Sequence, residues 1–313
     1  HDPWEQAQTM EDLSSGIQIV STLNRMGRFD EAFDVFESGL GEALSTNLLA
    51  LSEIQRLLQP IFPNGWDGPV ALKSEGKKYD ALIAFSHSFF YSAPYQCVLL
   101  SERAVECAVL SRNDINIRHG LRNLATALVH GKLAVSIRIR ALALEFSEAV
   151  GTDAALYESL VRAYIGEVHC GRFAQADALW FRLDPEEKKW GDEINVSELI
   201  RTRAFDLFWR GMLTAADLVA TERLSRESKD RFEIIQSLRL RGDWHMSRGE
   251  PGLAIEPLSE AVRLCRESGL DEPGFEACLA SACLRASQPN DGRAVAERFA
   301  DTQDYEGLLY VAH

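Results

Sequence analysis

Hydrophobic positions recur along almost the whole chain at the three- to four-residue spacing of amphipathic helices. Ala, Leu, Arg and Glu, which favour helix, are abundant, and runs of Val, Ile and Thr typical of strands are few. We therefore expect an all-α protein. The turn signals place its helices at 11–26, 30–43, 45–59, 77–92, 95–112, 114–130, 133–150, 153–170, 173–182, 193–210, 213–227, 230–248, 252–268, 272–286 and 291–300, with 302–313 starting a further hairpin.

A short phrase recurs along this pattern: a Gly followed, a few residues later, by Ala within an apolar helical stretch. From Gly131, whose copy has Ser136 in place of the Ala, successive copies follow after 40, 40 and 38 residues. Such regular spacing indicates a repeat architecture. The other copies begin at Gly27, Gly171, Gly211 and Gly249.

Each copy predicts a helical hairpin. Gly accepts the left-handed backbone conformation that ends the first helix, and the small Ala lets the second helix approach closely. A single hairpin leaves an apolar face uncovered, so neighbouring hairpins must stack.

This combination resembles the tetratricopeptide repeat, with the best copies at 16–40, 157–185, 197–224 and 235–264. The resemblance implies a right-handed superhelix, an α-solenoid of stacked antiparallel hairpins. The repeats here run near 40 residues, longer than the roughly 34 of that family. Leu124 and Tyr164 stand where it has a small residue, and Pro257 should bend a second helix.

A Pro- and Gly-rich stretch at 60–69 interrupts the repeats, and a weaker break follows at 184–191. We therefore divide the chain into an N-terminal hairpin with an extra helix (1–59), a joint (60–76) and a repeat array (77–313). Trp66 either plugs the joint, which we favour because a large Pro-rich turn needs an apolar anchor, or contacts another domain or a trigger.

Several sequence segments are similar to the C-terminal repeat region of bacterial STAND-type NTPases. In these proteins an ATPase core of the NACHT or NB-ARC type is followed by tetratricopeptide repeats. The similar segments are 27–36, 52–59, 60–67, 123–128 and 261–269. The resemblance implies a sensor region that binds a trigger and releases the ATPase to oligomerise, often in defence against phage. No GxxxxGK[ST] loop occurs in the chain, so we expect any ATPase domain upstream.

Charge and composition narrow the classes of partner. The net charge of −14 argues against a nonspecific nucleic-acid binder, and no apolar run reaches the roughly 20 residues of a membrane helix. The six cysteines are not spaced like the ligands of a zinc site. We expect them to be buried thiols of a cytoplasmic protein. The sequence begins at His1 and stops at His313 in a helical pattern, so we expect a piece of a longer chain, cut within a repeat.

Catalytic motifs are missing from the sequence: HExxH, GxSxG, EF-hand loops and glycine-rich dinucleotide turns do not occur. Five histidines, His87, His119, His130, His169 and His245, lie singly and far apart along the helices, a pattern more typical of packed or surface residues than of ligands. We therefore expect no enzyme activity, no cofactor and no metal.

Aligning the repeats on their turn glycines places arginines at nearly the same position of successive first helices. In the tetratricopeptide superhelix this position faces the concave groove, where an arginine row would bind carboxylate or phosphate groups. Three aromatic residues lie beside the row. The candidate binding residues are Arg118, Arg122, Arg162, Arg201, Arg239, Phe205, Phe208 and Trp209. The alternatives are that the arginines pair with Glu158, Glu198 and other carboxylates, and that the aromatics are core.

The sequence therefore predicts a non-catalytic sensor or interaction domain that binds a protein or peptide in its groove. A free-standing scaffold or co-chaperone, and the peptide-binding receptor domain of a transcription regulator, remain alternatives. We expect charge reversal at both Arg162 and Arg201 to abolish partner binding without unfolding the array.

Overall fold

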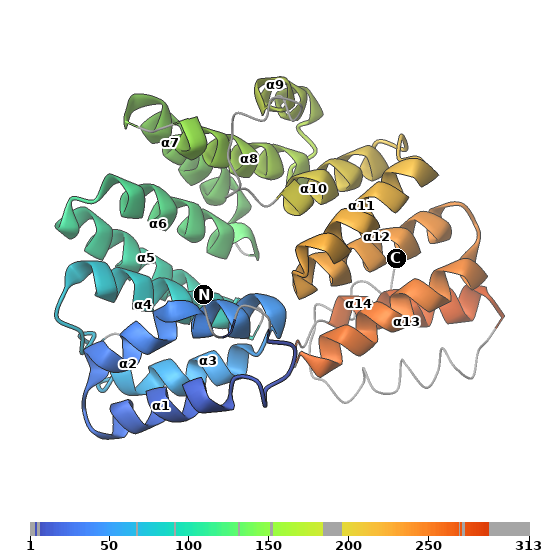
Figure 1. Ribbon diagram of the computed structural model, residues 1–313. Coiled ribbons are helices and arrows are strands. Elements are labelled where there is room, and N and C mark those ends of the chain that lie inside the picture. Colours follow the sequence, from blue (N-terminus) through green and yellow to red (C-terminus); the bar gives the residue numbers. More distant parts are fainter. Residues whose placement is uncertain are drawn as a thin grey trace. The chain divides into compact units, whose positions relative to one another are not determined.

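The computed structural model describes residues 4, 7–66, 68–90, 92–130, 132–150, 153–183, 196–268, 270 and 273–287. These residues form helices and turns and contain no strand, so the all-α prediction is confirmed (Figure 1). The chain divides into two compact units, His1–Ile194 and Asn195–His313, near the second of the two predicted breaks.

The first unit runs from the blue to the green helices of Figure 1. Its longer helices are α1 (Ser14–Arg25), α2 (Phe29–Val35), α3 (Leu51–Leu58), α4 (Glu75–Ser88), α5 (Pro94–Ser111), α6 (Asp114–Ala127), α7 (Leu133–Val150), α8 (Asp153–His169) and α9 (Phe173–Leu183). Short turns of other helix types lie between them: η1 (Phe36–Leu40), η2 (Ala43–Asn47), η3 (Gln59–Ile61) and η4 (Leu128–His130).

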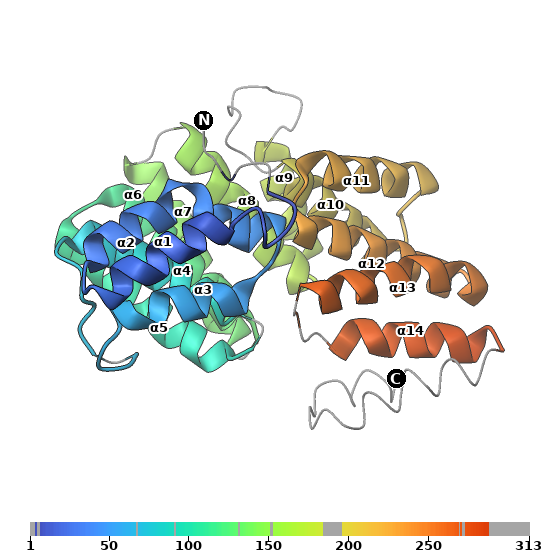
Figure 2. The ribbon, with the colours of Figure 1, turned by 60° about the horizontal axis from the view of Figure 1, so that its bottom comes forward.

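The second unit consists, over its described residues, of α10 (Val196–Trp209), α11 (Ala215–Ser228), α12 (Arg231–Ser247), α13 (Pro251–Glu267) and α14 (Pro273–Arg285) (Figure 2). In both units each helix packs mainly against its neighbours in the sequence, with close pairs at α4–α5, α6–α7, α8–α9 and α12–α13. This serial packing is that of an α-solenoid. No helix in the described part of the chain has the length and apolar character needed to cross a membrane.

The turn glycines behave as predicted. Gly27, Gly171, Gly211 and Gly249 each lie between the two helices of a hairpin with φ between 65° and 73°. Gly131 lies outside the described residues. A side chain larger than hydrogen is strained at such a φ, so the local chemistry of glycine fixes these turns.

The helix expected at 45–59 is wrong at its start. The chain leaves α2 through two π-helical turns, and α3 begins only at Leu51. Gly39 (φ 105°) and Leu49 (φ 52°) break the helical path, and the ring of Phe36 occupies the space that a side chain at residue 41 would need. Packing of an aromatic ring therefore overrides the helical periodicity here.

The segment 60–76 is anchored by aromatic packing. Trp66 stacks on Phe85 with ring centroids 5.0 Å apart and meets Phe89 edge-on at 4.7 Å. The Arg103 guanidinium donates hydrogen bonds to the carbonyl oxygens of Trp66 and Gly68. The interpretation of Trp66 as a plug is confirmed.

Three sequence expectations lie outside the described residues: the helix at 291–300, the hairpin start at 302–313, and the break at 184–191. Pro257 lies inside α13, which continues through it.

Gly242 on α12 lets the second helix of its hairpin approach closely. A Cβ atom there would lie 2.5 Å from Cγ of Leu258, which is fully buried. We predict that Gly242→Val lowers the free energy of unfolding of the second unit by roughly 1–3 kcal/mol through overpacking. Urea unfolding measures the loss. Gly274→Ala, where a Cβ meets nothing within 4 Å, is the control and should leave stability unchanged or higher. Equal stability of both variants would contradict the close-packing role.

Candidate functional site

The predicted binding residues lie on first helices of hairpins, as the alignment of repeats requires. In the first unit Arg118 and Arg122 are on α6 and Arg162 is on α8. The second unit holds the others: Arg201, Phe205, Phe208 and Trp209 on α10, and Arg239 on α12. A row running through both units stays a prediction.

In the first unit, Arg122 forms an ion pair with Glu158 of α8 through Nη1 and Oε1. The same carboxylate places Oε2 3.3 Å from Nε2 of His119. Both side chains of the ion pair are largely shielded from water. The pair links two successive first helices. It fits the alternative in which the arginines of the row pair with carboxylates on neighbouring helices.

Arg118 differs from Arg122 because it has no carboxylate partner among the described residues. Its Nη2 lies 3.0 Å from Nε2 of His119, and its buried Nε has no hydrogen-bond partner. Burial lowers the pKa of the Arg118 guanidinium. Nearby, the buried hydroxyl of Tyr79 is also without a hydrogen bond. An unpaired cation and an unsatisfied hydroxyl at one place carry a desolvation cost that an anion would offset.

The groups around Arg118 shift one another's ionisation. Burial, together with Arg122 and Arg118, lowers the pKa of His119 to about 4, so the imidazole is neutral at physiological pH. Burial raises the pKa of Asp80 on α4, and the charge of this carboxyl group opposes the lowering of the His119 pKa. Within α6 and α8 the site brings together the guanidinium groups of Arg118 and Arg122 and the carboxylate of Glu158. We call the residues Tyr79, Arg118, His119, Arg122 and Glu158 the first-unit polar cluster.

Arg162 is held in place through its backbone. The buried side chain of Arg140 on α7 donates a hydrogen bond of 2.6 Å to the carbonyl oxygen of Arg162. The aliphatic part of Arg140 lies over Gly166, where a Cβ would come within 2.8 Å of it. The sequence analysis did not single out Arg140, and only the glycine one helical turn after Arg162 signals this crossing.

In the second unit Arg201 forms a two-pronged ion pair with Glu233 of α12, with Nε–Oε2 and Nη2–Oε1 distances of 2.7 and 3.1 Å. The side chains are 13% and 3% exposed, so the pair is buried. Burial raises the pKa of Glu233, and Arg201 opposes the rise. Arg239 lies over the ring of Phe275 at 5.1 Å, with its Nε 3.5 Å from Asp243.

These contacts assign Arg201 a structural role. One partner is Glu233, one of the carboxylates on a neighbouring helix that the pairing alternative allows for. Charge reversal at Arg201 would place a second carboxylate against a buried one, which is strongly destabilising. This pair argues against the expectation that the Arg162 and Arg201 double variant stays folded, which remains a prediction.

The aromatic residues of α10 divide into core and surface. Phe205 and Phe208 are half-buried and pack against the cluster of Ala204, Leu213, Leu218 and Leu240. Trp209, whose ring centroid lies 5.9 Å from that of Phe205, is 47% exposed. Of the three aromatics, Trp209 therefore has the most surface for a partner.

Sequence reasoning missed Asp206, which is fully buried on the same helix. Arg203 and Arg210 each place a guanidinium nitrogen 2.6 Å from one of its carboxylate oxygens. The sequence indicated this network through spacing: Arg203 lies three residues before Asp206 and Arg210 four residues after it, positions that share one face of a helix.

Among the described residues, no three His, Cys, Asp or Glu side chains are grouped so that they could hold a metal ion. A comparison of the chain with models of known protein families, and another with curated protein sequences, gave no match.

We predict that Arg201→Met lowers the free energy of unfolding of the second unit by about 3–5 kcal/mol, because Glu233 is left buried and unpaired. An unpaired buried carboxyl group has a folded-state pKa above its unfolded value. Its stabilising contribution is present at low pH and is lost as pH rises, so the variant should be less destabilised at pH 5 than at pH 8.

Urea unfolding at both pH values measures this effect. Replacing both partners, with Arg201→Met and Glu233→Leu, should recover most of the loss. Arg223→Met, which removes an exposed pair with Glu227, is the control and should cost less than about 1 kcal/mol. A loss in Arg201→Met as small as in this control would contradict the structural role.

Proposed function

We propose that this chain is a non-catalytic protein-interaction domain that senses a protein or peptide on the concave face formed by its first helices. Support comes from the serial packing of hairpins, since such arrays present an extended surface made of equivalent helices. The left-handed turn glycines and the repeat spacing support assignment of these hairpins to the tetratricopeptide type.

The observation that carries the proposal is the unpaired guanidinium of Arg118 in the first-unit polar cluster. Arg122 and Arg201 already have buried or half-buried carboxylate partners, so a new anion would gain little from them. Arg118 has none among the described residues, and its burial already removes part of its hydration. An acidic group of a partner would supply the missing charge and hydrogen bonds.

The larger context we propose is the sensing arm of a STAND-type NTPase used in signalling or antiphage defence. The phrases at 27–36 and 60–67 carry the resemblance. The second phrase includes the Trp66 plug, which packs the joint into the core of the first unit. In this arrangement the repeats would hold an upstream ATPase domain until a trigger binds.

We predict that short acidic peptides selected from a displayed library bind the chain and that Arg118→Gln weakens them roughly 10- to 100-fold, the loss of a charged hydrogen bond. Fluorescence anisotropy of the selected peptides measures affinity. Arg138→Gln removes the same charge from an exposed site on the second helix α7 and is the matched control, with unchanged affinity expected.

Equal binding to the wild-type chain and to Arg118→Gln would overturn this site. Selection of neutral peptides whose affinity is independent of salt would overturn its electrostatic basis.

The proposed context predicts a GxxxxGK[ST] phosphate-binding loop upstream of His1 in the same reading frame. Sequencing the coding region checks it. A DNA-binding helix-turn-helix segment in that place would support the transcription-regulator alternative, and a start codon directly upstream would support the scaffold.

A further inference from the structure

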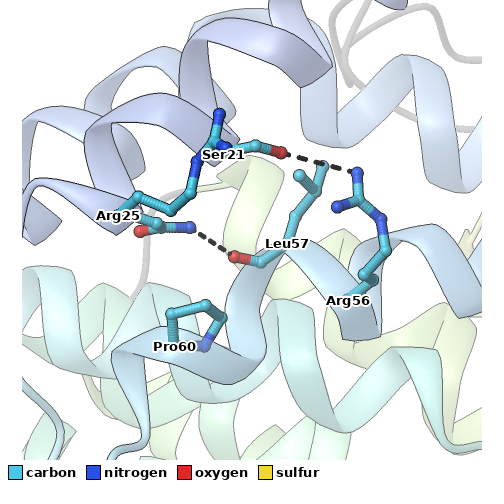
Figure 3. A pocket seen from close by; sticks show the side chains of 6 residues that line it. Ser21, Arg25, Arg56, Leu57 and Pro60 are labelled. Atoms are coloured by element: carbon cyan, nitrogen blue, oxygen red, sulfur yellow. Dashed lines mark hydrogen bonds between the residues drawn. The ribbon is translucent and has the colours of Figure 1, made fainter.

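We infer that a pocket between α1 and α3 is a binding site for a small anion that combines a carboxylate or phosphate group with a hydroxyl donor. The pocket has a volume of about 460 Å³ and is distinct in its residues from the first-unit polar cluster. Its walls come from Ser21, Asn24 and Arg25 of α1, Arg56 and Leu57 of α3, and Pro60 of η3 (Figure 3). This volume is within the range of small-molecule sites.

The charge of the pocket walls is positive. Arg25 has no carboxylate partner in the described part of the chain, and its one hydrogen bond is a 3.4 Å contact to the hydroxyl of Thr22. Arg56 pairs with Glu53 one turn earlier on its own helix and reaches the hydroxyl of Ser21 at 3.5 Å (Figure 3). Two guanidinium groups therefore line the pocket, and no acidic side chain does.

Helix-end electrostatics offer another reason for these arginines. Arg25 and Arg56 each lie in the last turn of their helix, where a cation complements the negative end of the helix dipole. That effect amounts to roughly half a charge at each helix end. It leaves a positive excess in the pocket, because Glu53 balances Arg56 but no carboxylate balances Arg25.

Asn24 adds a second, independent feature. Its side chain is 7% exposed, and its Nδ2 donates a hydrogen bond of 2.8 Å to the carbonyl oxygen of Leu57. This bond joins α1 to α3 and fixes one wall of the pocket. Its Oδ1 is buried and has no hydrogen-bond partner. A buried acceptor without a donor is costly, and a hydroxyl group of a ligand would supply that donor.

The remaining wall is apolar. Leu57 is buried, and Pro60 follows it three positions later in the chain. A ligand with a short carbon skeleton fits this wall, with its oxyanion toward the two guanidinium forks and its hydroxyl toward Asn24. Small hydroxy-acids and phosphorylated polyols share this chemistry.

Isothermal titration calorimetry at low ionic strength tests the site with malate, succinate, glycerol 3-phosphate and glycerol. We expect malate or glycerol 3-phosphate to bind, with the stronger of the two identifying carboxylate or phosphate as the preferred oxyanion. Neutral glycerol should not bind. Added salt should weaken binding. Arg25→Gln should weaken it roughly tenfold or more.

The matched control is Arg138→Gln, which should bind like the wild-type chain. Arg118→Gln should also leave this pocket unchanged, so failure here is distinguishable from failure of the proposed peptide site. Far-ultraviolet circular dichroism of each variant checks that the fold is retained.

Two results would overturn the inference. Absence of binding by both anions, or equal affinity in the wild-type chain and Arg25→Gln, would leave the arginines a helix-end role only. Equal affinity for malate and succinate, which differ in one hydroxyl group, would overturn the role given to Asn24.

Discussion

Each hairpin of this chain has an apolar face that only the next hairpin can cover, and the rest of the structure depends on this constraint. Small residues at the helix crossings allow neighbouring helices to pack closely. At Gly242 the backbone of α12 approaches Leu258 of α13 so closely that a Cβ atom has no room. Where the repeat pattern weakens, aromatic packing replaces it, as Trp66, Phe85 and Phe89 show in the segment before α4.

Close stacking of the hairpins also determines which charged side chains lose their hydration and need an ion-pair partner. Within each unit, first helices of successive hairpins lie side by side, as at α4–α6, α10–α12 and α12–α14, so a charged residue on one is desolvated by the next unless it finds a partner there. Arg122 with Glu158 and Arg201 with Glu233 meet this requirement across neighbouring first helices. Such pairs contribute little net stability against apolar replacements, but removing one partner is costly. They therefore fix which residues can be changed in a functional test.

The sequence predicted most of the fold because its main determinants are local. Helical periodicity and turn glycines at 171, 211 and 249 depend on the chemistry of a few adjacent residues. The π-helical turns after Phe36 could not be predicted in this way, because they depend on a ring packing into space that Gly41 leaves open. At the candidate site, the sequence named Glu158 as a possible partner but did not single out Glu233, since side-chain pairing depends on how α10 and α12 lie against each other.

The pocket between α1 and α3 was beyond the reach of sequence reasoning for the same reason. Its walls come together through a hydrogen bond between residues 33 positions apart, and Asn24 and Arg25 lie outside the recurring segment that begins at Gly27. What distinguishes Arg25 and Arg118 from the paired arginines is the absence of a carboxylate partner among the described residues, in a chain where Asp and Glu outnumber Lys and Arg by 47 to 33. An arginine that stays unpaired beside an unsatisfied buried acceptor or hydroxyl is therefore the physical signature by which a binding residue can be told from a structural one.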